Sequence, residues 1–202
     1  MPPLHRLLPG LVALLVLVPT AALAPGCTTL QQLAALQQVD FGLTGVDDGR
    51  LAGVNIDRVR STQQLRPTDL ARLTASVAQG DLPLAFTLHV DATNPEENGV
   101  PARLVQLDWT LLVDGAETVS GIFNDDRLIE PGTTADLPIS IRLDLLDFFQ
   151  DSAPELIGLA LNLAGAGGDP ARLSLRARPT INTAIGPITY PGTITISYTV
   201  GR

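Results

Sequence analysis

The sequence predicts a mainly β protein, an antiparallel sandwich or barrel, in one domain spanning residues 50–202. Several segments after about residue 50 alternate apolar and polar residues, which is the pattern of a strand with one buried face. Glycine, proline and aspartate turns separate these segments, as in antiparallel all-β domains. Hydrophobic residues make up 45% of the 202 positions, so the chain can form a core and is not disordered throughout.

Charge and cysteine content exclude several classes of function. The formal net charge is −8, and all 13 basic residues are arginines. An acidic chain without a basic cluster is a poor match to phosphate backbones, so we expect no nucleic-acid partner. Two histidines and one cysteine exclude a disulfide framework and zinc sites built from several Cys and His ligands.

Residues 1–26 are predicted to be a signal peptide. A start with Arg6 as its firm positive charge leads into the apolar run Leu11–Val18, and small residues follow. A retained membrane anchor is the alternative, but Pro9 and Pro19 interrupt the apolar stretch, which barely reaches the length of a spanning helix. We therefore expect export.

Two cleavage sites remain open. Cleavage after Ala24, in the small-x-small sequence Ala22–Ala24, would release a soluble protein. The sequence from Ala24 to Cys27 resembles a bacterial lipobox, and it contains the only cysteine of the chain. An acylated Cys27 would hold the protein on a membrane, because acyl chains partition firmly into bilayers. The resemblance, with Thr28 after the cysteine, implies the periplasmic face of the outer membrane.

Residues 27–49 are predicted to be the lipidated cysteine and a tether. The part from Thr28 to Val39 is either a short helix or flexible, and the sequence does not decide between them. The part from Asp40 to Gly49 contains three glycines and is predicted to be a loop.

The predicted strands follow in order. Leu82–Thr93 alternates throughout. In Leu104–Val113 we expect Val105 and Trp109 to point inward, and Asp114-Gly115 is a tight hairpin turn. The remaining predicted strands are Glu117–Phe123, Leu137–Leu143, Arg172–Arg178 and Thr193–Val200.

Two segments have helical spacing. Pro67–Gln79 starts with proline and is followed by Gly80, and Ser152–Leu163 opens with Ser152 and Glu155 in the spacing of a capping box. We expect both helices to pack over an end or edge of the sheets.

Candidate chemistry is sparse. His89 and Asp91 share one face of a strand, which could orient a base, but a solvated strand histidine is the favoured interpretation. No serine stands in the strand-to-helix turn that hydrolases use. The acidic and glycine-rich segments are predicted to be turns or loops or to face solvent, and not calcium sites, paired catalytic acids or phosphate loops: Asp47–Asp48, Asn124–Asp126, Asp144 with Asp147, and Gly165–Gly168. We expect no enzyme activity, cofactor or metal.

The middle of the chain resembles the late embryogenesis abundant type 2 domain, also called the water stress and hypersensitive response domain. The resemblance lies in an ordered series: an apolar strand ending in Asn94-Pro95, a strand with Trp109, the Asp114-Gly115 turn, and a returning strand with Gly121. It implies an immunoglobulin-like antiparallel β-sandwich with one or two short helices, in which Asn94 and Pro95 are structural turn residues. It carries over no catalytic residue.

These observations favour a non-catalytic lipoprotein that is anchored to a membrane through Cys27 and has a stress or desiccation-protection or scaffolding role. The alternative is a carrier or sensor of an apolar ligand, such as a lipid, held between the sheets. Envelope proteins are further possible partners. A hydrolase built around His89 is the least favoured hypothesis.

Overall fold

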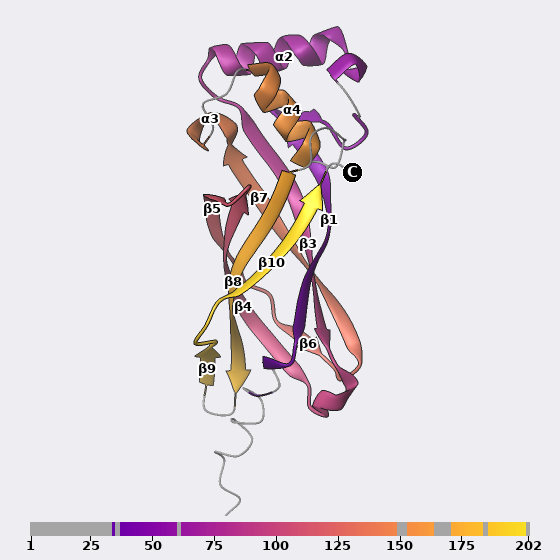
Figure 1. The fold of residues 1–202 in the computed structure, drawn as a ribbon, viewed down its shortest axis with the longest axis vertical. Helices are drawn as coiled ribbons and strands as arrows, with labels where there is room; N and C mark the ends of the chain where they lie inside the picture. Colours follow the sequence, from indigo (N-terminus) through magenta and orange to yellow (C-terminus); the bar gives the residue numbers. More distant parts are fainter. Residues whose placement is uncertain are drawn as a thin grey trace, which may run out of the picture.

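The computed structural model describes residue 34 and residues 37–59, 62–148, 153–163, 171–183 and 186–200. Two antiparallel sheets pack face to face in this part of the chain, and helices gather at one end of them (Figure 1). The predicted fold class, a mainly β antiparallel sandwich, is confirmed.

The smaller sheet has four strands in the order β2-β1-β3-β7. Strand β3 is its centre and pairs along its whole length with β7, from Pro83 opposite Asp144 to Asn94 opposite Thr133. Alternate residues of β3 are fully buried, as the sequence predicted. The bounds are β1 Asp40–Leu51, β2 Val54–Asn55, β3 Pro83–Asn94 and β7 Thr133–Asp144.

The larger sheet has six strands. Four of them run in the order β10-β8-β4-β5, with β6 paired to β4 and β9 paired to β8. The central pair, β4 and β8, comes from distant parts of the chain, since Val113 lies opposite Leu173. The bounds are β4 Ala102–Val113, β5 Ala116–Phe123, β6 Arg127–Ile129, β8 Ala171–Thr183, β9 Gly186–Thr189 and β10 Ile194–Val200.

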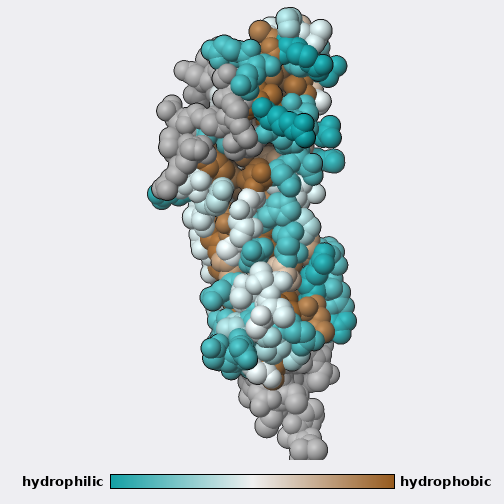
Figure 2. All heavy atoms as spheres, turned by 90° about the vertical axis from the view of Figure 1, so that its right-hand side faces the viewer, coloured by the Kyte–Doolittle hydropathy of each residue, from teal (hydrophilic) through white to brown (hydrophobic). Residues whose placement is uncertain are grey.

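The core lies between the sheets and consists mainly of leucine, isoleucine and valine. Leu88 of β3, Leu107 of β4 and Leu175 of β8 are all 0% exposed. Burying such a side chain contributes about 1.5–3 kcal/mol, so the inner faces hold the two layers together. Figure 2 shows hydrophilic side chains over most of one side of the molecule, with hydrophobic ones in separate small patches.

The helices lie at one end of the sandwich (Figure 1). Helix α2, Pro67–Ala78, begins with proline, has Gln79 as its C-cap and is followed by Gly80 at φ 78°, in agreement with the helix predicted for Pro67–Gln79. Helix α4, Ala153–Leu163, matches the second predicted helix, although the capping role of Ser152 and Glu155 lies outside the described residues. The short helix α3, Leu145–Phe148, and the 3-10 turns η1, Thr62–Gln64, and η2, Glu96–Asn98, were not predicted.

The loop predicted for Asp40–Gly49 is wrong. These residues belong to β1, which pairs with β3 from Asp40 opposite Thr93 to Leu51 opposite Leu84. The register shifts twice along this pairing, and Asp48 has a φ of 54°. Each irregularity moves the following residues out of strict alternation, which hides a strand from a test for period two. The first strand of the sheet therefore begins within segment 27–49 and continues to Leu51.

The inward direction predicted for Val105 is also wrong. A register shift between Leu104 and Gln106 leaves Val105 out of the regular pairing with β8, and its side chain is only partly buried. Leu104 before the bulge and Leu107 after it are both buried. A bulge adds one residue, so the positions that face the core switch from even to odd residue numbers. A single alternating pattern therefore does not fit both sides of the bulge. Trp109 points inward, as predicted.

Candidate functional site

The outward side chains of the six-stranded sheet form a polar surface, which we call the arginine face. It is named for Arg172, Arg176 and Arg178, which are exposed along β8. They alternate with buried Leu173, Leu175 and Ala177, so the pleat of the strand places all three guanidinium groups on the outer side. Hydroxyl side chains of β4, β5, β8 and β10 surround them: Thr110, Ser120, Ser174, Thr195, Ser197 and Thr199.

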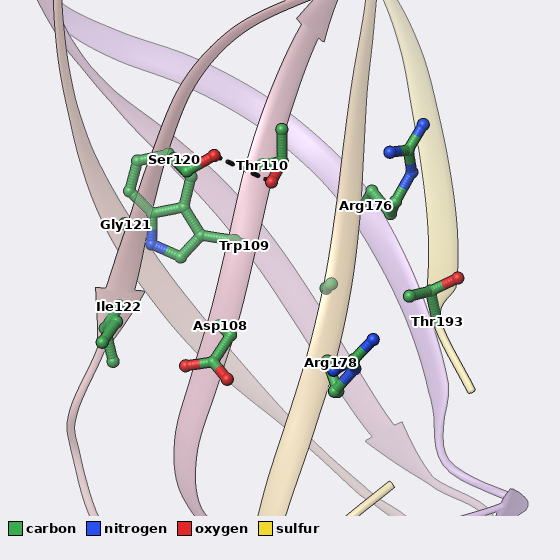
Figure 3. Close-up of a pocket in the computed structure, with 10 residues that line it drawn as sticks. Asp108, Trp109, Thr110, Ser120, Gly121, Ile122, Arg176, Arg178 and Thr193 are labelled. Carbon is green, nitrogen blue, oxygen red and sulfur yellow. Dashed lines mark hydrogen bonds between the residues drawn. The ribbon is translucent and has the colours of Figure 1, made fainter. Parts of the chain in front are cut away.

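The first hollow in the arginine face has a volume of about 420 Å³ and lies over β5, β4 and β8. Figure 3 shows Arg176 and Arg178 beside Thr193 on one side of it, with Asp108 and Thr110 on the neighbouring strand. The Thr110 and Ser120 hydroxyls are hydrogen-bonded at 2.9 Å. Arg176 makes an ion pair of 2.5 Å with Glu117, whereas Arg178 makes no ion pair within the described ranges.

The second hollow lies on the same face and has a volume of about 460 Å³. Arg172 and Ser174 of β8 line it together with Ser197 and Thr199 of β10. The Ser174 and Ser197 hydroxyls are hydrogen-bonded across the two strands at 2.8 Å. Both hollows therefore combine an arginine of β8 with a pair of bonded hydroxyl groups.

Trp109 and Gly121 fix the packing beneath the first hollow. They are cross-strand neighbours on β4 and β5, and the Trp109 side chain is 7% exposed. A Cβ atom on Gly121 would lie 2.4 Å from Cζ2 of the indole, which is far inside contact distance. The Trp109 side chain therefore leaves no room for a larger residue at position 121. The tryptophan and the glycine that were identified in the sequence pack directly against each other.

His89 is held between two carboxylates on the outer face of the four-stranded sheet. Its Nδ1 lies 3.0 Å from Asp136 on β7, and its Nε2 lies 3.2 Å from Asp47 on β1. Burial alone would lower the pKa of His89, but the hydrogen bonds to Asp136 and Asp47 outweigh it and hold the pKa above its ordinary value. Asp91, the partner considered in the sequence, is not the residue that holds the ring.

This arrangement has the contacts of a surface ion pair. Each ring nitrogen faces a different carboxylate, so neither is directed at a nucleophile or a substrate pocket in the described structure. A single ion could not be ligated by all three groups from opposite edges of the ring. No group of three or more potential metal ligands occurs among the described residues.

Asn94 is a buried junction as well as a turn residue. Its side chain is 0% exposed, and its Nδ2 donates hydrogen bonds to the carbonyl oxygens of Val100 at 3.0 Å and Ile129 at 2.9 Å. Its Oδ1 accepts from Asn98 at 2.6 Å. Pro95 follows at φ −64° and precedes η2. The side chain thus joins the end of β3 to η2 and β6, which a turn propensity alone does not indicate.

Asp114 and Gly115 form the predicted two-residue hairpin turn between β4 and β5. Their φ angles are 49° and 87°, which is the left-handed geometry that this turn requires at both positions. The Asp114 carboxylate also accepts the backbone N–H of Arg172 at 2.8 Å. The turn is thereby attached to the start of β8.

Three of the remaining acidic candidates, Asp125, Asp126 and Asp144, have structural partners. Asp125 pairs with Arg127 at 2.7 Å, and Asp126 pairs with Arg103. The Asp144 carboxylate accepts the backbone N–H groups of Leu82 and Leu146. Burial raises the pKa of Asp144, but hydrogen bonds from Asp81, Leu146 and Leu82 outweigh it and lower the pKa.

The signal peptide, Cys27 and the glycine-rich segment Gly165–Gly168 lie outside the described residues. Within the described ranges, no helix combines the length and apolar character needed to cross a bilayer. The arrangement that sequence reasoning did not recognise is the arginine face. Its signal was present, because arginines 172, 176 and 178 share one parity of the strand while Leu173, Leu175 and Ala177 take the other.

The sequence matches no family model, and no curated protein matches it. Solved structures show distant likenesses, at 13–14% identity. One is a protein from Archaeoglobus fulgidus, with a TM-score of 0.35 over 80% of this chain and 98% of the other. Another is from Arabidopsis thaliana, with 0.41 over 81% and 83%. A third is described as a late embryogenesis abundant protein, with 0.39 over 88% and 79%. The sandwich architecture rests on the strand pairing of the described residues.

Proposed function

We propose that this protein is an exported lipoprotein without catalytic activity, anchored through Cys27, that protects or scaffolds components of the cell envelope when water is lost. The observation that carries the proposal is the arginine face. Its hydroxyl and guanidinium groups spread over four strands, and none of them converges on a nucleophile and base. Such a surface is suited to holding polar partners by many bonds and not to transforming one of them.

The physical basis is the exchange of hydrogen bonds. A hydroxyl group bonded to water gains only about 0.5–1.5 kcal/mol when it bonds to a partner. When water is withdrawn, polar groups on envelope components lose their bonding partners, and a protein surface with many donors and acceptors can take their place. The resemblance of the segment around Asn94-Pro95 and Asp114-Gly115 to the water stress domain supports the same role.

Membrane anchoring is tested by Cys27→Ser in the full chain, expressed in a double-membraned bacterium. We expect the parent protein in the membrane fraction and the variant in the soluble fraction, because the variant has no thiol to acylate. His89→Ala serves as the matched control and should fractionate with the parent. Membrane retention of the Cys27→Ser variant would refute the lipid anchor.

Protection is tested by drying and rehydrating cells that express the full chain, with survival counted against cells carrying an empty vector. We expect higher survival with the parent protein and with His89→Ala, since the proposal assigns no chemistry to the histidine. Loss of survival in His89→Ala would favour the hydrolase hypothesis. A lipid that copurifies with the protein, detected by native mass spectrometry, together with unchanged survival on drying, would favour the apolar carrier.

A further inference from the structure

We propose that the arginine face binds an acidic polysaccharide, a polymer that carries both hydroxyl and carboxylate groups, along β8. This inference rests on the proposed function, because it names the partner of the same surface. Three features support it: the charges of the face, the spacing of its arginines, and the donors and acceptors that line the two hollows.

The charges favour an anion at two points on the face. Arg176 is neutralised by Glu117, and the Asp114 carboxylate is engaged by the backbone N–H of Arg172. Arg172 and Arg178 are exposed and make no ion pair within the described ranges. One of these two arginines lines each hollow. A guanidinium group is a planar fork that matches a carboxylate with two parallel bonds.

The spacing favours a polymer. Arg172 and Arg178 are six residues apart on one strand, which is about 20 Å at about 3.3 Å per residue. A small anion cannot contact both of them. The hollows lie along the same strand between these two positions, so one extended chain that follows β8 would contact both hollows.

The hydrogen-bonding groups favour a sugar over a phosphate-rich surface. The pairs Thr110–Ser120 and Ser174–Ser197 are hydroxyl groups, which both donate and accept. Asp108 lies opposite Arg178 in the strand register and lines the first hollow. A carboxylate only accepts, so its partner must supply donors. Sugar hydroxyls supply them, whereas the phosphate groups of a polyphosphate offer Asp108 no donor.

The test measures binding of the immobilised full chain, in mild detergent, to three soluble polymers. Polygalacturonate offers hydroxyl and carboxylate groups, dextran offers hydroxyl groups alone, and polyphosphate offers anionic groups without donors. We expect polygalacturonate to bind, with affinity that falls as salt is raised because the arginines are exposed. Dextran and polyphosphate should bind at least about tenfold more weakly.

Two double variants decide whether the face is responsible. Arg172→Gln with Arg178→Gln should weaken polygalacturonate binding by about tenfold or more, because both charge-assisted contacts are lost. Arg50→Gln with Arg142→Gln changes the net charge equally but alters exposed positions in the four-stranded sheet, and it should leave binding unchanged. Equal losses in both double variants would overturn the inference, since general charge would explain them. So would absence of polygalacturonate binding, or stronger binding to polyphosphate or to anionic lipid vesicles.

The same double variants are scored for survival on drying, which separates this inference from the proposed function. Protection without polygalacturonate binding would overturn the inference and leave the proposed function standing. Polygalacturonate binding without any protection would refute the proposed function and leave the binding face standing.

Discussion

Replacing Asn94 should destabilise the sandwich by more than the loss of a favourable turn residue, because its side chain makes buried hydrogen bonds. The Asn94→Ala change removes the donors to two carbonyl oxygens, those of Val100 and Ile129, at a position that is 0% exposed. An unsatisfied buried group costs about 1–3 kcal/mol, so the expected loss is about 2–4 kcal/mol if the carbonyl oxygens near the surface recover part of it from water. For a domain of this size the melting temperature should fall by about 5–15 °C.

The assay is urea unfolding at pH 7. The free energies of unfolding are compared between variants whose dependence on urea concentration, the m value, is unchanged. The isosteric change Asn94→Asp places acceptors where the donors were, so it should destabilise at pH 7 at least as much as Asn94→Ala and should recover partly in acid, where the carboxyl group can donate. Asn182→Ala, at an exposed position of β8, is the control and should stay within about 0.5 kcal/mol of the parent. An Asn94→Ala loss below about 1 kcal/mol would refute the reasoning.

Two further predictions concern packing and pH. Gly121→Ala should lower the free energy of unfolding in urea by about 1–3 kcal/mol, because its Cβ would overlap the Trp109 indole. Gly121→Ala should cost less in a chain that also carries Trp109→Phe, and an equal cost in both backgrounds would contradict the contact. The pKa of His89 is raised in the folded state, so its ion pairs should stabilise the protein fully below the ordinary value of 6.5, with the contribution lost as pH rises through the raised pKa. His89→Gln should therefore lower the free energy of unfolding by less than about 1 kcal/mol at pH 5, since the side chains are partly exposed, and by still less at pH 8. A larger loss at pH 8 than at pH 5 would show that the pKa of His89 is not raised by folding.

Regular strands were predictable because one residue in two faces the core. The alternation of Leu82–Thr93 predicts β3 closely, and Asp114-Gly115 marks the turn between β4 and β5 through φ angles that only a few residues adopt easily. Strand β1 was hidden because it has two register shifts and a residue at positive φ. Irregular strands keep their pairing but lose their periodicity, so the pattern alone cannot reveal them.

At the candidate sites, contacts within one strand could be predicted from the sequence, whereas contacts between distant strands could not. The arginines of β8 lie on one strand, so their common face follows from the sequence. His89 is different, because Asp47 and Asp136 reach it from β1 and β7. Those contacts depend on strand order and register, which nothing local in the sequence specifies. Asn94 is intermediate: the Asn-Pro turn is visible in the sequence, but the carbonyl groups that it bonds come from two other segments.

The pairing of β4 with β8 has a consequence for how the chain reaches its final state. Val113 pairs with Leu173, so the central contact of the larger sheet cannot form until synthesis has passed residue 173. Domains dominated by such distant pairings fold in milliseconds to seconds, more slowly than helical bundles. Under the proposed export, a chain that stays unfolded over that interval remains able to pass through a narrow translocation pore, and we expect the sandwich to form only after the chain has crossed the membrane.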